Sequence, residues 1–588
     1  MKKRPIVMIT FFTFSFLLTI LSACNNSQVT KESFTGIVRE EDKDTPIAIR
    51  EINITNKPKQ IDSTPITQSK IDNAIPPTPF NKILQPSPTS PVEKLTRAER
   101  KGSLKVPTNA WFSNMDPHKE PSSSFAAWGP GIAYHRLMKF TNGPNVKLPS
   151  MKTECDICSE WQFEDLHTIT FTINSDIPWV TSNGSIIDTV SAQDIAFSLN
   201  RQKTEGWSNA HILHMIKDAT AITESKLEVT LSAPDADLFI ALANGRSKIL
   251  PHKNITNLEY QDPENVVSSG SWLLEKVDNN SSALMIANPN NLSTPHLDNI
   301  EFHYLPEAKT RRSAYLVGLL DIYRVEQFDK DNVELEIKLE DPKPGLGLQV
   351  VFNTQKEPFS NLHLRRSVMN SINPKNIIEN VWGNRAFFSM GYPMISSDWE
   401  VEESIWSTYF GNPDKSLTEL EQQGLEIPYP ITITSANYGD MHIQTLNVIS
   451  DQLTVGGFAP SLQILNRREF GETALTNSDY QMLVGPTFPQ TSPNGHLLTL
   501  LHSKGAWNKS GYSNSLFDQL LETQASQFDD KKRSQNISEI NLILLNEGVR
   551  FMPVTMIHMW AWHYQIKHFY PNFSLEEYSH WEHISLID

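Results

Sequence analysis

Histidines near the C-terminus are the residues of this chain best suited to hold a metal or a haem. His558, His563 and His568 recur every five residues, among neighbours such as Met559 and Trp560. Imidazole and thioether groups are both competent ligands. A spacing of five, however, places successive side chains on neither one face of a helix nor one face of a strand. We therefore interpret this segment as a mixture of core and surface, and expect no metal site and no cofactor.

The cysteines offer a second kind of chemistry. The chain has three, of which Cys155 and Cys158 form a Cys-Asp-Ile-Cys motif. In an oxidising compartment a lone CxxC is most simply a local disulfide that closes a turn. A redox site or half of a metal site is the alternative, although no second CxxC supports zinc.

The sequence contains none of the familiar catalytic signatures. A GxSxG elbow, an HExxH helix, a P-loop and a dinucleotide fingerprint are all absent. Many glycosidases show only two scattered carboxylates, so an extracytoplasmic hydrolase is kept as a minor alternative. The sequence favours a binding protein over an enzyme.

Strand and helix patterns alternate along the chain, which indicates an α/β protein. The apolar residues of 167–173 alternate with polar ones, and those of 227–231 repeat the pattern, so both segments are predicted to be half-buried strands. Ser191 and Asp194 form a capping-box pattern that predicts the start of a helix.

Later segments add further α/β units. Residues 431–434, a helical pattern over 441–453, the Gly456-Gly457 pair and residues 462–465 together predict a βαβ crossover with a glycine C-cap. Two more helices are expected over 515–527 and 531–547. A last apolar segment, 551–556, is predicted to be a strand that returns to an earlier sheet. The region after residue 100 exceeds the about 250–300 residues at which single cores stop growing, so two or three lobes are expected.

The N-terminus has the order of an export signal. Lys2, Lys3 and Arg4 precede an apolar run that ends in Leu21-Ser22-Ala23-Cys24. The run is shorter than the about 20 apolar residues that span a bilayer, and the cysteine at the cut resembles a lipobox. We expect a signal peptide over 1–23, lipid attachment at Cys24, and a position on the periplasmic side of the cell envelope. Inner or outer membrane is left open.

Residues 24–100 are rich in Pro, Ser, Thr and Asn and show no sustained apolar period, so we expect a disordered membrane tether. The whole chain carries a formal charge of −16. An acidic surface argues against nucleic acid as a ligand, because nucleic acid demands basic patches.

Several segments, taken in order, resemble the family 5 extracellular solute-binding proteins, which serve peptide, nickel and oligosaccharide importers. The matching stretches are Met115-Asp116-Pro117-His118-Lys119; Ser159 to Arg201, with Ile177-Pro178-Trp179 and Ser191 to Arg201; Ala287 to Ile322, with Lys309-Thr310-Arg311; Phe352 to Ser367, with Phe352-Asn353-Thr354; and Asn508 to Leu521. Each match is diffuse, but their order and spacing follow the family over most of residues 103–560.

The resemblance implies an α/β fold of the type II periplasmic-binding-protein class, with two hinged lobes and an extra subdomain. Lobe I would comprise 101–119, 251–345 and 551–588. The extra subdomain would be 120–250 and lobe II 346–550. Ligand binding in such a fold stabilises the closed state.

The resemblance also suggests ligand-facing loops. The residues carried over are Ser122, Ser123, Trp207, Thr487, Phe488 and Gln490. In the peptide receptors the second loop resembles GW-x-x-D-Y-x-x-P, whose aspartate meets the free amine of the peptide. Here Pro486 replaces the tryptophan and Pro489 the aspartate. A buried ammonium without its acceptor costs several kcal/mol, so free-amine peptides are not the expected ligand.

The sequence therefore predicts a lipid-anchored, monomeric receptor that captures a peptide-like solute or an oligosaccharide and delivers it to an ABC permease. A sensory receptor that works without a transporter is the alternative within the binding proteins.

Overall fold

The computed structural model describes residues 102–587, apart from 149, 254–264, 292–294, 326–336, 395–396, 488–491 and 572–576. Cys24, the signal peptide and the tether therefore lie outside the described residues. Among the helices that are described, none is long and apolar enough to cross a membrane.

The first sheet combines one strand from the start of the described chain with three strands from residues 272–304. Its strands, in spatial order, are β1 (Ser103–Thr108), β13 (Asn299–Tyr304), β12 (Ser282–Ala287) and β11 (Trp272–Asp278). β1 joins β13 in parallel, whereas the other neighbours are antiparallel. Leu104 and Val106 of β1 alternate with more exposed residues and reach a core that also holds Trp581.

A second antiparallel sheet follows along the chain. Its order is β4 (Cys158–Phe163), β5 (Thr168–Ile173), β9 (Lys226–Leu231) and β8 (Ile216–Thr223). The two strands predicted from alternation are therefore confirmed, and they pair directly, with Ile169 opposite Val229. The predicted capping box is confirmed at the start of α3 (Ala192–Gln202), where the side chains of Ser191 and Asp194 each accept from the other's backbone N–H. Cys155 and Cys158 are joined by a disulfide.

The largest sheet contains the predicted crossover. Its order is β14 (Ile322–Val325), β20 (Arg550–Trp562), β15 (Ile337–Phe352), β19 (Met482–Pro486), β17 (Tyr429–Ala436) and β18 (Phe458–Leu465), and β16 (Ala386–Ser389) also pairs with β20. The β17, α10 (Asp440–Val455), β18 unit is parallel, which confirms the βαβ prediction. Gly456 is the C-cap of α10, and Gly457 has a φ of 95° that suits glycine.

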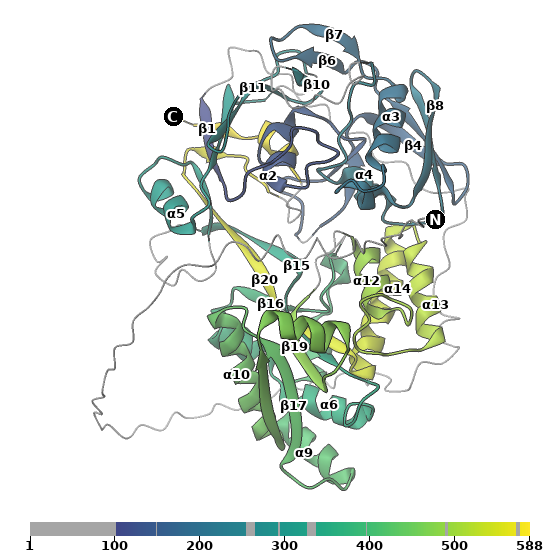
Figure 1. Ribbon diagram of the computed structural model, residues 1–588, viewed down its shortest axis with the longest axis vertical. Coiled ribbons are helices and arrows are strands. Elements are labelled where there is room, and N and C mark those ends of the chain that lie inside the picture. The colour runs from purple at the N-terminus through teal and green to yellow at the C-terminus, as the bar shows by residue number, and fades with distance from the viewer. Residues whose placement is uncertain are drawn as a thin grey trace, which may run out of the picture. The chain divides into compact units, whose positions relative to one another are not determined.

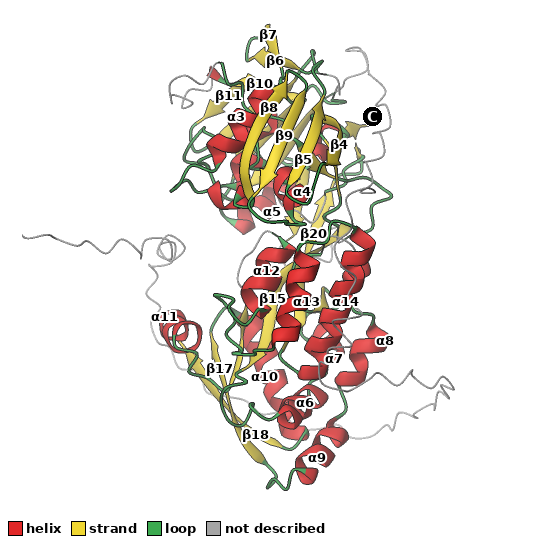
Figure 2. Cartoon of the chain, turned by 90° about the vertical axis from the view of Figure 1, so that its right-hand side faces the viewer, coloured by secondary structure: helices red, strands yellow, loops and turns green. Residues whose placement is uncertain are grey.

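Helices lie beside this sheet, as Figure 2 shows for α12 to α14. The longer ones are α6 (Leu362–Ser371), α7 (Pro374–Asn380), α9 (Pro413–Gln422), α12 (Pro493–Leu501), α13 (Ser515–Ala525) and α14 (Asp530–Glu547). α13 and α14 match the two helices predicted before the last strand.

Short elements complete the fold. The helices among them are α2 (Ser123–Ala126), α4 (Leu238–Ala243), α5 (Ala308–Leu316), α8 (Glu403–Trp406) and α11 (Arg467–Phe470). The strands are β2 (Met138–Phe140), β3 (Thr153–Cys155), β6 (Pro178–Thr181), β7 (Ile186–Thr189), β10 (Val267–Ser268), β21 (Ile566–Lys567) and β22 (Ser585–Leu586).

β20 links two hydrophobic cores. Phe551 and Val554 at its start pack with the core of α6, α13 and α14, whereas Trp560 near its end packs with the core of the first sheet. Figure 1 shows β20 in yellow beside β15. The predicted late strand is confirmed, and it runs farther than 551–556.

The hydrophobic cores combine segments that lie far apart in the sequence. The segment from Phe125 to Tyr134, expected in the extra subdomain 120–250, packs in the core of the first sheet. The rest of that subdomain shares a continuous core with α13 and α14, through contacts such as Phe163 with Phe528, whose ring centroids lie 4.4 Å apart. Sequence patterns do not report such contacts, because the partners are distant along the chain.

Candidate functional site

A cavity of about 190 Å³ lies where five segments meet. The end of β1, the region of α2, and residues of α5, β14 and β20 all contribute to it. Its lining residues are Pro107, Thr108, Asn109, Ser123, Ser124, Trp128, Arg311, Ile322, Arg324 and Trp560. The site thus brings together residues that are more than 400 positions apart in the sequence.

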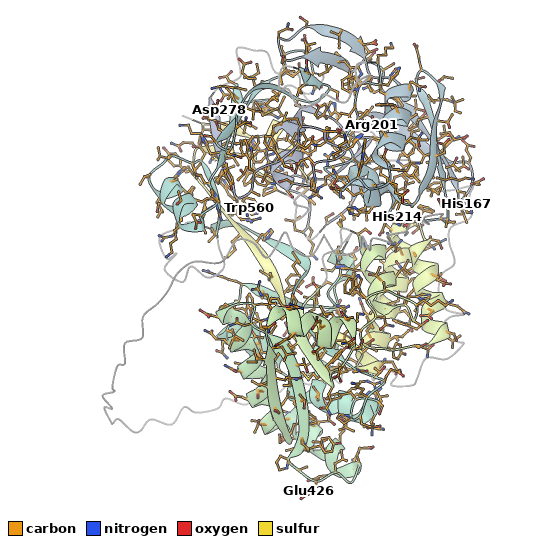
Figure 3. All side chains as sticks on the ribbon, in the orientation of Figure 1. His167, Arg201, His214, Asp278, Glu426 and Trp560 are labelled. Carbon is orange, nitrogen blue, oxygen red and sulfur yellow. A yellow bond between two sulfur atoms is a disulfide. The ribbon has the colours of Figure 1, made fainter. Side chains whose placement is uncertain are left out.

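Two tryptophans form a flat wall of this cavity. Trp128 and Trp560 stack with ring centroids 5.2 Å apart and an angle of 3° between their planes. Trp581 meets Trp128 edge-on at 5.0 Å, and Phe569 meets Trp560 edge-on at 5.7 Å, so neighbouring rings fix the pair in place. Trp560, labelled in Figure 3, is 3% exposed, and no described residue accepts a hydrogen bond from its Nε1. A planar apolar wall of this kind suits a flat or apolar group.

Two arginines give the cavity its charge. Arg311 donates to the carbonyl oxygens of Leu305 and Pro306, at 2.8 and 2.7 Å, which anchors α5 to the end of β13. Arg324 comes from β14. No aspartate or glutamate is found among the described residues that line the cavity. The electrostatic environment therefore favours an anionic or acceptor-rich group, and guanidinium groups bind carboxylates especially well.

The first predicted loop reaches this site in part. Ser123 lines the cavity, and Ser124, which the sequence did not single out, lies beside it. The Ser122 hydroxyl caps α2 by accepting from the backbone N–H of Ser124 at 3.1 Å. Ser122 therefore stabilises the N-terminus of α2 and is not among the residues that line the cavity.

Trp207 belongs to a different cluster. Its ring lies under the Lys119 ammonium, 4.8 Å from the centroid, and under the Arg201 guanidinium, at 4.6 Å. Arg201 in turn donates to both carboxylate oxygens of Asp116, at 3.0 and 2.7 Å. Trp207 thus supports the motif at 115–119 and does not line the cavity.

This cluster fixes the loop that leads into the cavity. The Arg201 guanidinium also donates to Nδ1 of His118 at 3.0 Å, and Nε2 of His118 lies 2.8 Å from the carbonyl oxygen of Lys248. Burial, together with the charge of Arg201, lowers the pKa of His118 to about 4, so the ring is neutral. Nδ1 then accepts and Nε2 donates, which assigns one tautomer. The Lys248 ammonium donates to the carbonyl oxygen of Ala126 at the end of α2.

The second predicted loop begins at the end of β19. Thr487 is 6% exposed, while Phe488 and Gln490 lie outside the described residues. Pro486 pairs with Leu348, and its carbonyl oxygen accepts from Nε2 of Gln349 at 2.8 Å. The structure therefore describes where this loop starts, but its contacts with the cavity remain a prediction.

The C-terminal histidines have unlike surroundings. His558 and His580 are buried, whereas His568 is exposed. Within the described residues no group of three or more His, Cys, Asp or Glu side chains is placed to hold a metal ion. Burial lowers the pKa of His580 to about 3.

Sequence reasoning missed most of the cavity. Arg311 was noted only within the Lys309-Thr310-Arg311 motif, and nothing in its local pattern marks Arg324. Trp560 was noted only as a neighbour of the C-terminal histidines, and Trp128 was not singled out. Because the lining comes from five separate segments, only the folded chain brings these residues together.

Comparisons with known proteins agree on one family. The model of bacterial extracellular solute-binding proteins, family 5 (middle), matches residues 154–509. A dipeptide-binding protein of Escherichia coli is 21% identical over 71% of this chain and 82% of its own length. Heme-binding protein A of Haemophilus influenzae is 22% identical over 71% of this chain and 80% of its own.

Solved structures show the same fold. A periplasmic murein tripeptide-binding protein in its unliganded open form aligns with a TM-score of 0.71 and 16% identity, covering 83% of this chain and 97% of its own. A Helicobacter pylori periplasmic binding protein in complex with the peptide STSA aligns with a TM-score of 0.59 and 18% identity, over 84% and 99% of the two chains.

Proposed function

Since this chain belongs to the family 5 bacterial extracellular solute-binding proteins and has their α/β type II fold, we propose that it is the solute receptor of an ABC importer. The solute is a peptide-like molecule with an anionic group and without a free ammonium. No covalent chemistry is required, because a ligand that binds the closed state more tightly shifts the population toward it.

The cavity between β1, α2, β14 and β20 supports this choice of solute. Its wall of Trp128 and Trp560 offers a flat apolar face, and Arg311 and Arg324 offer positive charge. A peptide ammonium there would meet like charges and no described carboxylate. The loss of the acidic residue at Pro489 in the second loop points in the same direction. An oligosaccharide could use the tryptophan wall, but a neutral one would gain nothing from the positive charge of the two arginines.

We further propose that the receptor is held to the membrane through Cys24. The lipobox-like Leu21-Ser22-Ala23-Cys24 supports lipid attachment, and the Pro- and Ser-rich segment 24–100 would give the receptor reach. At about 0.8 kcal/mol per buried methylene, two or three acyl chains anchor a protein stably. The receptor then acts as a monomer on the periplasmic side of the envelope.

The test is to identify the natural solute. Protein purified from its own cells, without added ligand, is denatured, and the released small molecules are analysed by mass spectrometry. We expect a compound with a carboxylate or similar group and no primary amine. A preparation that releases only free-amine peptides would contradict the proposed solute class, and one that never releases a solute would count against the receptor function itself.

A further inference from the structure

Arg550 is a buried arginine for which the described part of the chain supplies no ion-pair partner. It is the first residue of β20 and lies opposite Val351 of β15, inside the lobe formed by the large sheet. Arg550 is 4% exposed, and neither its Nε nor its Nη2 has a hydrogen-bond partner among the residues that the structure describes. An unpaired buried guanidinium is costly, so this feature calls for an explanation.

Other buried arginines in the described part of the chain have carboxylate or carbonyl partners, although Nε of Arg136 makes no hydrogen bond. Arg136 forms a bidentate pair with Glu577, at 3.2 and 3.0 Å. Arg533 pairs with Asp237 at 2.6 Å. Arg365 donates to the carbonyl oxygens of Glu547, Phe359 and Ser360. Arg550 therefore differs from these three arginines, because no described carboxylate or carbonyl group pairs with it.

The surroundings of Arg550 do not neutralise it. Burial lowers its pKa to about 10, so it stays protonated at neutral pH. The nearby phenol of Tyr480 is neutral, because burial raises its pKa well above the ordinary value. Burial and the charge of Arg550 lower the pKa of His496 to about 3, so that ring is neutral as well. The charge on Arg550 is thus present and uncompensated.

A small cavity lies against this guanidinium. Its volume is about 10 Å³, room for one water-sized particle. The polar groups on its lining are those of Gln349, Trp507, Lys509, Ser510 and Arg550, and leucines and Val351 complete it. Two of these residues are cations, and no described lining residue is acidic.

The uncharged donors are already engaged. Gln349 donates to the carbonyl oxygen of Pro486, and the Ser510 hydroxyl donates to Oδ1 of Asn508 at 2.7 Å. The Lys509 ammonium lies 5.5 Å from the centroid of the Trp507 ring, and burial lowers its pKa. Arg550 and Lys509 are therefore the groups left to hold a guest, and both require negative charge.

We propose that this cavity is an anion site, lined by Arg550 and Lys509, which holds a halide-sized ion or one oxygen of a carboxylate group. A water molecule could fill the space but would not offset the charge. Sulfate and phosphate are too large for the cavity. The carboxylate could belong to a free small acid or to the transported solute, and only the second source rests on the proposed function.

The test is thermal unfolding of the full mature chain at constant ionic strength, with sodium gluconate replaced stepwise by sodium chloride or sodium formate. The melting temperature of the unaltered protein should rise saturably, by several degrees, as expected for a ligand that binds only the folded state. Arg550→Met should show no such rise. Arg366→Met, which alters a partly buried arginine outside the cavity, should respond like the unaltered protein.

The pattern of responses identifies the source of the anion. A chloride response indicates a free ion, and a response to formate alone indicates a carboxylate. If neither chloride nor formate raises the melting temperature, the small-molecule fraction released from the denatured protein is added back. If that fraction stabilises the unaltered protein but not Arg550→Met, the carboxylate belongs to the solute. Equal responses of the unaltered protein and Arg550→Met to all three overturn the proposal.

A diffraction experiment covers the case in which Arg550→Met does not fold. Crystals of the unaltered protein are grown in sodium bromide, and anomalous scattering is measured. A bromide peak, or carboxylate density, beside the Arg550 guanidinium supports the site. A cavity that holds only water refutes it.

Discussion

The Arg201 guanidinium donates two hydrogen bonds to the Asp116 carboxylate, at 3.0 and 2.7 Å, although the two residues are 85 positions apart. The pair joins α3 to the loop that enters the cavity, and the side chains are only 10% and 6% exposed. Burial alone would raise the pKa of Asp116, but the hydrogen bonds and charge of Arg201 hold it below its usual range. This relationship links two sequence motifs that look unrelated in the linear chain.

Breaking this pair should destabilise the protein. Asp116→Asn leaves the Arg201 charge without its counter-ion, and we expect a loss of about 3 kcal/mol in the free energy of unfolding, measured by urea denaturation. The control is Asp188→Asn, which removes an exposed ion pair with Lys253 and should have no measurable effect. If both substitutions lowered the free energy of unfolding by the same amount, the buried pair would contribute no more to stability than the exposed one.

Arg324 should contribute to solute affinity. Arg324→Gln removes a positive charge from the cavity, and a lost charge-assisted hydrogen bond of about 1.5–3 kcal/mol corresponds to roughly a 10- to 100-fold weaker affinity. The measurement is calorimetric titration with the solute recovered from the protein. Arg468→Gln, on an exposed arginine, serves as the control. If Arg324→Gln bound the solute with unchanged affinity, the cavity would not be the place where the solute binds.

The pair of Arg533 and Asp237 should couple α14 to the segment before α4. Both side chains are almost fully buried, and Nδ2 of Asn494 donates to Asp235 beside them. Arg533→Met leaves a buried carboxylate unpaired, so we expect a loss of about 3–5 kcal/mol. Scanning calorimetry should then resolve two transitions instead of one. A single transition at an unchanged temperature would contradict this coupling.

Buried neutral histidines should make the protein sensitive to acid. Burial lowers the pKa of His442 to about 4, and of His496 to about 3. In the unfolded chain these histidines become protonated near pH 6.5. In the folded chain they become protonated only near their lowered pKa values. Their contribution to stability is therefore complete above pH 6.5 and declines as the pH falls toward 4, by at most about 1.4 kcal/mol per pH unit for each histidine.

Substitution can assign part of this acid sensitivity. His442→Gln should reduce the slope of unfolding free energy against pH by about one proton between pH 6 and 4.5. His167→Gln, on an exposed histidine, should leave the slope unchanged. Identical slopes in the unaltered protein and in His442→Gln would show that this ring does not titrate as described.

Local patterns predicted the regular elements because burial leaves a period in the sequence. The alternation in β5 and β9 and the capping box of α3 are of this kind. β20 was predicted too short, because it is buried on both faces from Arg550 to Thr555 and again from Ile557 to Ala561, so its sequence shows no alternation. The resemblance to a family supplied the fold class, which periodicity alone could not.

The site was harder to predict, because its residues share no local signal. Ser123 was reached through the resemblance, yet Arg324 and Trp560 enter the cavity only through the pairing of β14 with β20. The burial of Arg550 was equally hard to predict. An arginine just before an apolar strand is expected at the surface, and only the structure shows that this one is buried.

Calorimetric titration of the intact protein with its own released solute, and in parallel with unblocked di- to pentapeptides, tests the central claim most directly. We predict that the released solute binds with a submicromolar dissociation constant and one-to-one stoichiometry, while the free-amine peptides give no such binding. Submicromolar binding of the unblocked peptides, or no binding of the released solute, would contradict it.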